Sequence, residues 1–124
     1  DQTSDSKNRK IYPEGLYASI QKANKLKIPI IITENGISTS DDTLKNNYIK
    51  QHLHAVKKAI KDGYNVQGYM LWAPIDCWGW DNGFKGKYGL YGVDHATKER
   101  FFRPQAAEYL SEVIKASNAA PSLN

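Results

Sequence analysis

A glutamate directly follows an apolar run in the segment Ile30-Ile31-Ile32-Thr33-Glu34-Asn35-Gly36. With Ile28, this run is apolar on both faces, which is typical of a buried strand in a parallel sheet. The carboxyl ends of such strands form the active face of α/β folds and hold side chains rigidly toward a pocket. Glu34 is therefore a candidate catalytic carboxylate. The alternative at this position is a capping or surface glutamate in a turn.

Three tryptophans lie close together in the segment Trp72-Ala-Pro-Ile-Asp-Cys-Trp-Gly-Trp80, which follows a second apolar run. Glycine and proline make this segment unsuitable for a helix, so it is expected to be a loop. Sugar rings stack their C–H faces on indole rings, and an aromatic wall of this kind would suit a carbohydrate. Core packing explains one or two of these tryptophans equally well.

Other chemistries find little support. His52 and His54 lie two residues apart on an expected helix and face different directions, and His95 lies in a turn, so no metal site is expected. Cys77 has no base near it in the sequence, which argues against a cysteine nucleophile. A single cysteine allows no disulfide within the chain, which favours a cytoplasmic compartment. No cofactor is expected, because no glycine-rich loop stands between a strand and a helix.

The charge is mildly basic, with 17 Lys and Arg against 13 Asp and Glu. The lysines are spaced as on solvated helix faces, which argues against a nucleic-acid partner. They are Lys22, Lys25, Lys27, Lys45, Lys50, Lys57, Lys58 and Lys61. No apolar run approaches the ~20 residues of a membrane span, so no membrane partner is expected either.

Apolar spacing predicts the elements that position these residues. Helices are expected at about 13–27, starting at Pro13, and at about 43–62, stopped by Gly63. Strands are expected at about 28–32 and 66–72, followed by a loop at 73–84, a hairpin of 88–93 with 100–103, and a helix from Pro104. That last helix should turn Ala107, Leu110, Val113 and Ile114 inward.

The alternation of helices and strands predicts an α/β fold with a parallel sheet. Two strands leave their edges unpaired, so we expect this chain to be part of a larger α/β barrel or sheet. Its expected partner is the missing N-terminal part of that barrel or a self-associated copy. Residues 1–10 are interpreted as an irregular lead-in, and residues 118–124 as a frayed tail.

Several motifs resemble, in order, the C-terminal quarter of family 1 glycoside hydrolases. They are Tyr12-Pro13-Glu14-Gly15-Leu16, Ile32-Thr33-Glu34-Asn35-Gly36, Gly68-Tyr69-Met70-Leu71-Trp72, Tyr88-Gly89-Leu90-Tyr91-Gly92-Val93-Asp94, and Lys98 with Arg103-Pro104. The resemblance covers residues 11–117. It implies the C-terminal portion of a (β/α)8 TIM barrel, about strands seven and eight with their flanking helices.

The resemblance also implies a retaining β-glycosidase in which Glu34 is the nucleophile. Retention uses a second carboxyl group, about 5–5.5 Å away, as acid and base. In the family that glutamate belongs to an Asn-Glu-Pro motif, which does not occur in this chain, so the chain alone is not expected to be an efficient enzyme. By resemblance Trp72 stacks on the sugar, the indole N–H of Trp80 binds a hydroxyl, and Asn35 belongs to the substrate site.

One position departs from the family pattern. A glutamate that grips two sugar hydroxyls is usual where this chain has Gly79, and each such charged hydrogen bond contributes about 1.5–3 kcal/mol. The 6-phospho-β-glycosidase branch has serine there, followed by a lysine and a tyrosine, and this chain has Gly86 and Tyr88 at those two positions. Lys85 and Lys87 flank the missing lysine and are candidate phosphate contacts. Gly79 would leave room for a phosphate and could donate its backbone N–H, so Gly79 and Tyr88 are candidate substrate-binding residues.

Three hypotheses therefore remain open. The first is a β-glucosidase-like enzyme fragment, and the second is a fragment of a 6-phospho-β-glycosidase. The third is a non-catalytic carbohydrate-binding or interaction fragment that keeps the aromatic wall but lacks the acid/base residue.

Overall fold

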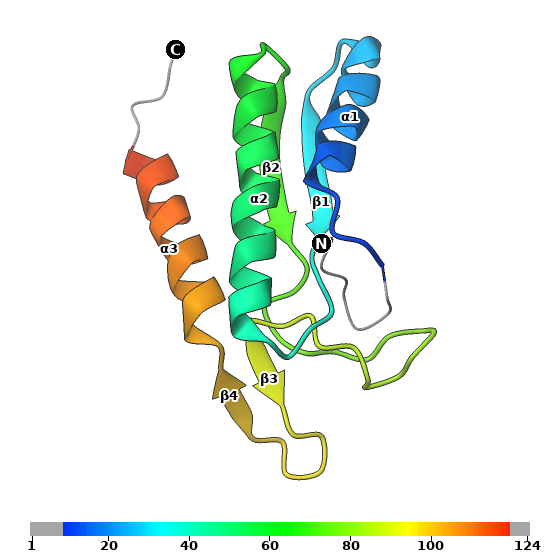
Figure 1. Ribbon diagram of the computed structural model, residues 1–124, viewed down its shortest axis with the longest axis vertical. Helices are drawn as coiled ribbons and strands as arrows, with labels where there is room; N and C mark the ends of the chain where they lie inside the picture. The colour runs from blue at the N-terminus through cyan, green and yellow to red at the C-terminus, as the bar shows by residue number, and fades with distance from the viewer. Residues whose placement is uncertain (1–8, 120–124) are drawn as a thin grey trace.

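The computed structural model describes residues 9–119. Two parallel strands lie side by side behind two helices, and a third helix and a hairpin extend from this layer (Figure 1). In chain order the elements are α1 (Pro13–Ala23), the short 3₁₀ helix η1 (Asn24–Leu26), β1 (Ile30–Asn35), α2 (Asp42–Lys61), β2 (Val66–Leu71), β3 (Tyr91–Val93), β4 (Arg100–Phe102) and α3 (Pro104–Ala119). The predicted alternation of helices and strands is confirmed.

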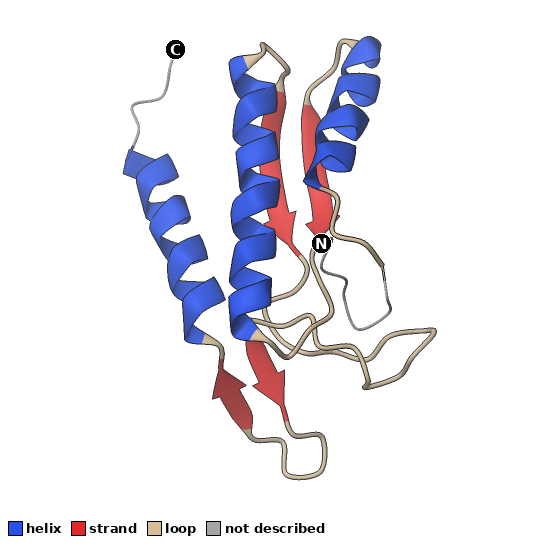
Figure 2. Cartoon of the chain, viewed as in Figure 1, coloured by secondary structure: helices blue, strands red, loops and turns tan. Residues whose placement is uncertain are grey.

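The parallel pair β1–β2 is covered on one face only. α1 and α2 lie on the same side of the two strands (Figure 2). On that side Ile30 and Ile32 pack against a buried cluster formed by Ile20, Val56 and Ala59. On the other face, side chains such as Ile31 are exposed, 54% in this case. No described element covers this second face, so burial on both faces stays a prediction for the complete barrel, and the fragment itself shows the uncovered apolar face that the sequence leads us to expect.

The helix boundaries follow from local chemistry. α1 has Pro13 at its first position, where the missing N–H costs nothing. It ends earlier than predicted, because η1 replaces its last turn and Lys27 adopts a left-handed backbone with φ of 57°. α2 begins behind Asp41, whose carboxylate accepts a hydrogen bond from the Leu44 N–H at 3.0 Å. Gly63, at φ of 89°, ends the helix as predicted.

The N-terminal ends of α2 and α3 are joined by hydrogen bonds. Asp42 accepts hydrogen bonds from the backbone N–H groups of Gln105 at 2.8 Å and Ala106 at 3.1 Å. Ala106 is fully buried in a cluster with Ile49 of α2. Figure 1 shows α3 leaning away from α2 toward its C-terminal end, which explains why Ile114, predicted to face inward, is 51% exposed.

The chain ends differ from their sequence interpretation in one respect. α3 continues to Ala119 and so includes residues 118–119, which were assigned to the frayed tail. Residues 120–124 and most of the expected lead-in, residues 1–8, lie outside the part of the chain that the structure describes. Within residues 9–119, no helix is both long and apolar enough to cross a membrane.

The hairpin is shorter than predicted. β3 and β4 pair antiparallel with Tyr91 opposite Phe102 and Val93 opposite Arg100. Asp94 closes the turn by accepting hydrogen bonds from the N–H groups of Ala96 and Thr97. These two hydrogen bonds lower the pKa of the Asp94 carboxyl.

Candidate active site

β1 extends to Asn35 instead of ending at about residue 32 as predicted, so Glu34 lies within the carboxyl end of the strand, and it is exposed. Its neighbour Asn35 is opposite Leu71 in the parallel register, and the Trp72 N–H donates to the Asn35 carbonyl at 2.9 Å. The strand ends that carry Glu34 and Trp72 therefore meet at one edge of the sheet, as the sequence predicts. No described element covers Glu34, so its carboxylate is available to a ligand at this edge.

The two strand ends are in close backbone contact. A Cβ atom added to Gly36 would lie 1.7 Å from the Trp72 carbonyl oxygen, so only glycine fits at this position. The Asn35 side-chain oxygen accepts a hydrogen bond from the Tyr69 hydroxyl at 2.8 Å. Burial raises the pKa of this tyrosine, which therefore stays a neutral donor. These contacts fix the backbone on both sides of Glu34.

The tryptophans form an exposed group. Trp72 is 40%, Trp78 50% and Trp80 94% exposed. The rings of Trp78 and Trp80 meet edge to face, with centroids 5.1 Å apart. Core packing does not account for any of the three, and the interpretation as a surface aromatic wall remains.

Gly79, between Trp78 and Trp80 in the chain, begins a tight turn that ends at Gly83. Its N–H donates to the Gly83 carbonyl, and the Gly83 N–H donates back to the Gly79 carbonyl, both at 2.8 Å. A Cβ atom at position 79 would come within 2.4 Å of the Asn82 side-chain oxygen. The N–H of Gly79 is thus committed within the turn, and in this conformation it does not point at a ligand.

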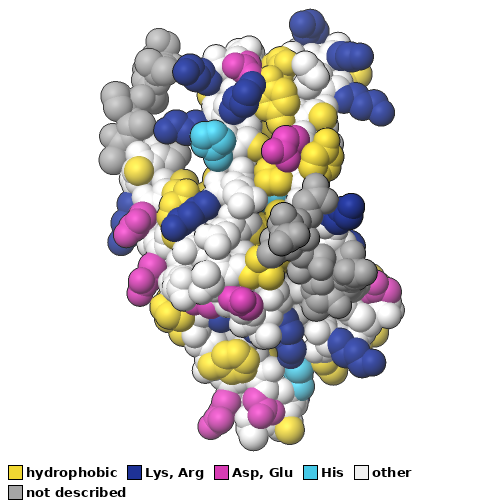
Figure 3. Space-filling model, viewed as in Figure 1, with side chains coloured by type: hydrophobic (Ala, Val, Ile, Leu, Met, Phe, Trp, Pro, Cys, Tyr) yellow, Lys and Arg dark blue, Asp and Glu magenta, His cyan; other side chains and the backbone are white. Residues whose placement is uncertain are grey.

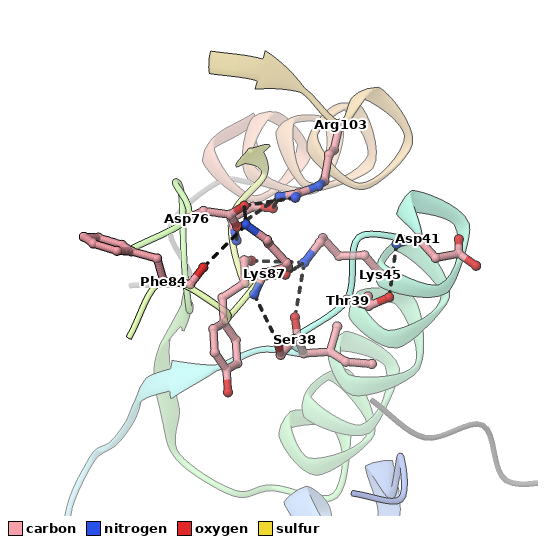
Figure 4. Close-up of polar contacts among 11 residues, drawn as sticks. Ser38, Thr39, Asp41, Lys45, Asp76, Phe84, Lys87 and Arg103 are labelled. Atoms are coloured by element: carbon pink, nitrogen blue, oxygen red, sulfur yellow. Dashed lines mark hydrogen bonds and ion pairs between the residues drawn. The ribbon is translucent and has the colours of Figure 1, made fainter. Parts of the chain in front are cut away.

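The other predicted contacts separate into two groups. The Tyr88 hydroxyl accepts a hydrogen bond from Arg9 at 3.0 Å, and Lys85 is exposed to solvent. Lys87 turns inward instead, with its Nζ 3.5 Å from the Phe84 carbonyl oxygen and 4.0 Å from a carboxylate oxygen of Asp76 (Figure 4). Of the two lysines proposed to contact a phosphate, only Lys85 extends into solvent.

A group of polar side chains, all buried except that of Lys87, lies beneath the site, and sequence reasoning missed it. We call this group the polar hub; its members are Ser38, Lys45, Asp76, Lys87 and Arg103 (Figure 4). The Arg103 guanidinium forms hydrogen bonds to both oxygens of Asp76, at 3.1 and 3.0 Å, and one to the Gly89 carbonyl at 2.6 Å. Asp76 in turn accepts from the Gly89 N–H at 2.7 Å.

Lys45 corrects the view that all the lysines are solvated. Its residue exposure is 1%, and its Nζ donates to the carbonyls of Ile37 at 3.2 Å, Lys87 at 2.9 Å and Tyr88 at 3.2 Å. Burial, helped by the positive charge of Arg103, lowers the pKa of Lys45 to about 8. One available signal was helical phase, because Lys45 stands on the same face of α2 as the buried Ile49.

His52 is a packing residue, whereas His54 on the same helix is exposed. His52 is 4% exposed, its Nδ1 lies 2.9 Å from the Tyr48 carbonyl oxygen, and its ring stacks on the Tyr48 ring with centroids 3.8 Å apart. Burial lowers the pKa of His52. In the described part of the chain, no three His, Cys, Asp or Glu side chains form a group that could hold a metal ion. On the helix-covered face, basic and acidic side chains are interspersed (Figure 3).

A carboxylate and exposed indoles at the carboxyl edge of a parallel strand pair, with helices on one side, are typical of a segment of an α/β barrel and form a candidate sugar site. Residues 1–119 match the sequence profile of glycosyl hydrolase family 1. The chain belongs to this family of glycosidases, and its fold is the C-terminal portion of the family's (β/α)8 TIM barrel.

Three relatives illustrate the match. A beta-galactosidase from Pyrococcus woesei is 43% identical over 104 residues, covering 84% of this chain and 20% of the relative. A 6-phospho-beta-galactosidase from Leptotrichia buccalis is 41% identical over 111 residues, covering 80% and 24%. The solved structure of a beta-glycosidase from Pyrococcus horikoshii is 37% identical, with a TM-score of 0.83, covering 98% and 30%. The chain thus spans between a fifth and a third of the length of these proteins.

Proposed function

We propose that this chain supplies the nucleophile, Glu34, for retaining hydrolysis of β-glycosidic bonds in a complete barrel. The observation that carries the proposal is the place of Glu34, exposed at the carboxyl end of β1 and one residue from the backbone contact with Trp72. Membership of a glycosidase family supports the reaction class. The sugar substrate and the rest of the barrel are the proposed partners, in a cytoplasmic setting.

In the proposed first step, a carboxylate oxygen of Glu34 attacks the anomeric carbon. The bond from that carbon to the leaving oxygen breaks, and the leaving oxygen takes a proton from a second glutamate. In the second step that glutamate removes a proton from water, whose oxygen attacks the anomeric carbon and releases the Glu34 carboxylate. The second glutamate belongs to the rest of the barrel, so the isolated chain is proposed to be inactive.

The exposed indoles support a sugar ring bound beside Glu34. Trp72 would stack on the glycone, Trp80 would donate its indole N–H to a hydroxyl, and Asn35 and Tyr88 would line the same site. The proposed substrate is a β-glucoside-like sugar without phosphate. It is supported by the turn at Gly79, where the N–H is used internally, and by the inward side chain of Lys87.

A second candidate substrate is a 6-phospho-β-glycoside. It is favoured by the identity with the 6-phospho-beta-galactosidase of Leptotrichia buccalis and by the exposed Lys85. Against it, Gly86 stands where the phosphorylated branch has a lysine, and a Cβ atom there would lie 3.0 Å from the Tyr88 ring. A non-catalytic carbohydrate-binding role is the remaining alternative, because it needs only the indoles.

Covalent labelling tests the reaction. The chain is grafted in place of the matching segment of the Pyrococcus woesei beta-galactosidase and incubated with an activated 2-fluoro β-glycoside, whose good leaving group needs no acid. Peptide mass spectrometry should find one fluoroglycosyl adduct, on Glu34, and none in the Glu34→Gln graft. An adduct on another residue would refute the assignment of Glu34 as the nucleophile. If the graft carries no adduct while the unaltered host enzyme is labelled, the non-catalytic alternative is supported instead.

A substrate pair tests the glycone. Release of nitrophenol is compared for an aryl β-glucoside and its 6-phosphate in the graft, with the host enzyme as the baseline. Equal or faster turnover of the plain glucoside supports the first substrate class. Faster turnover of the 6-phosphate in the graft, but not in the host, would support the 6-phospho-β-glycoside. This preference should then be lost in Lys85→Met and kept in Lys57→Met, a matched change at the surface.

A further inference from the structure

One buried side chain joins the two segments that carry the candidate site. The first segment follows β1 and contains Ile37, three residues after Glu34. The second contains Lys87 and Tyr88, which follow the tryptophan-containing segment 72–80 in the chain. The Lys45 ammonium lies between them and donates to carbonyls of both, at distances of 2.9–3.2 Å.

We propose that Lys45 is a positioning residue that sets the spacing between the segment bearing Glu34 and the segment bearing Tyr88. The inference rests on the proposed function, because that spacing matters for catalysis only if Glu34 and the sugar-binding side chains act on one substrate. Lys45 contacts no substrate in this proposal and acts only through the backbone of the two segments.

The geometry suits an ammonium group in particular. A protonated lysine has three N–H donors, and here all three find backbone carbonyls. Two further hydrogen bonds link the same segments: the Thr39 N–H donates to the Lys87 carbonyl at 3.0 Å, and the Lys87 N–H donates to the Ser38 hydroxyl at 3.1 Å. The Lys87 carbonyl therefore accepts from both Lys45 and Thr39, and the two contacts form one connected set.

The surrounding charges are mixed. The negative charges of Asp76, which follows β2 in the chain, and of Asp42 on α2 favour the charged form of Lys45, whereas the positive charge of Arg103 opposes it. Lys87, whose Nζ lies 4.0 Å from an Asp76 oxygen, adds a further positive charge next to this group. Because all three hydrogen-bond partners of Lys45 are neutral carbonyls, its charge is held by dipoles and not by a direct ion pair.

The connection should respond to pH. Burial lowers the pKa of Lys45 to about 8, so the amine begins to lose its proton just above neutral pH. A neutral amine has only two N–H donors, and its lone pair faces carbonyl oxygens. Deprotonation therefore leaves one of the three carbonyls without its hydrogen bond, and the two segments should loosen.

The test uses the full chain, labelled with ¹⁵N, in NMR titrations from pH 6.5 to 9.5. In the wild type, the amide signals of Thr39 and Lys87 should shift together with a midpoint near that of Lys45, while amides of α1 stay in place. Lys45→Arg should abolish the titration of both signals, at whatever positions they then have, because a guanidinium keeps its charge over this pH range. Lys45→Met should hold them displaced throughout, and Lys57→Met, on the exposed face of the same helix, should behave as the wild type.

The proposal is overturned if the two amide signals do not titrate in the wild type, or if Lys45→Arg titrates as the wild type does. If Lys45 served only the overall stability, its titration would shift amide signals throughout the fold and not only in these two segments. If Lys45→Met does not fold, the wild-type and Lys45→Arg titrations still decide. The titration involves no sugar and no reaction at Glu34, so its outcome is independent of the labelling experiment.

A kinetic comparison in the graft adds a functional readout. Lys45→Met should lower kcat/KM by about tenfold, since small displacements of catalytic groups carry large rate penalties, and the control Lys57→Met should stay within about twofold of the wild type. Equal kcat/KM in all three proteins would show that Lys45 does not position the site.

Discussion

The two halves of this chain are stabilised by different kinds of contact. In the strand–helix layer, branched apolar side chains of β1 and β2 pack against α1 and α2. Beneath the site, the long segment from Trp72 to Leu90 has little regular structure, and the polar hub ties it to α2 and to the start of α3. The first half is built mainly from apolar contacts, whereas the second adds specific buried hydrogen bonds to an apolar cluster that contains Ile37, Ile49 and Ala106.

This difference has a physical consequence. Apolar packing is non-directional, so the strand–helix layer should tolerate volume-conserving changes. Buried charges need their particular partners, because a charge that loses its partner keeps the cost of desolvation. We therefore expect the half that contains the polar hub to be the more sensitive one, although much of it lies outside regular secondary structure.

Removing one partner of the buried ion pair should have the largest effect on stability. Arg103→Ala leaves the Asp76 carboxylate buried and without its guanidinium, which should lower the free energy of unfolding by about 3–5 kcal/mol. Urea denaturation of the chain measures it. Lys58→Ala breaks an ion pair with Asp62 that is exposed, and it should have a much smaller effect. Equal effects of the two changes would remove the distinction between hub and surface.

A cavity in the strand–helix layer should come next. Ile20 is 2% exposed against Val56 and Ala59, so Ile20→Ala should cost about 2–4 kcal/mol by the same measurement. Hydrogen exchange should increase in β1 and β2 more than at the Lys87 amide in the hub. Ile31→Ala, on the uncovered face, is the control and should change the unfolding free energy little. A larger loss for Ile31 would mean that the second face is covered in solution.

The pH dependence of stability should differ between the wild type and Lys45→Met. The pKa of Lys45 is lowered from 10.5 to about 8 in the folded chain, so between these values the unfolded chain binds more protons than the native one. The free energy of unfolding of the wild type should therefore rise with pH relative to Lys45→Met, by at most about 1.4 kcal/mol per pH unit. Parallel curves between pH 8 and 10 would show that the lysine has its ordinary pKa.

The smallest expected effect is at the start of α2. Asp41 accepts a hydrogen bond from the Leu44 N–H, and Asp41→Ala should cost about 1 kcal/mol in thermal or urea unfolding. Asp41→Ser keeps an acceptor oxygen and should retain most of this stability. A loss as large as that of Arg103→Ala would instead place Asp41 within the hub.

The same division explains what could be predicted from the sequence. Apolar periodicity, Pro13 and Gly63 are local signals, and they located the helices and the parallel strands. The hub depends on partners that are distant in the chain, such as Lys45 with Lys87 and Asp76 with Arg103. No local pattern distinguishes Lys45 from the solvated lysines beside it, apart from its phase on the helix.

The site was predictable to a similar extent. The positions of Glu34 and Trp72 at one sheet edge follow from the strand pattern, and the structure confirms that the two strand ends meet. The inward turn of Lys87 and the internal hydrogen bond of Gly79 depend on the folded loop, so the sequence could not reveal them.

The central claim is that Glu34 forms the covalent bond to the sugar, and chemical rescue tests it most directly. In the grafted barrel, Glu34→Ala should abolish hydrolysis of a dinitrophenyl β-glycoside without lowering the melting temperature. Sodium azide should then restore turnover and give an α-glycosyl azide, because azide attacks from the face that Glu34 has vacated. Undiminished hydrolysis by Glu34→Ala, or a β-glycosyl azide as the product, would contradict the account.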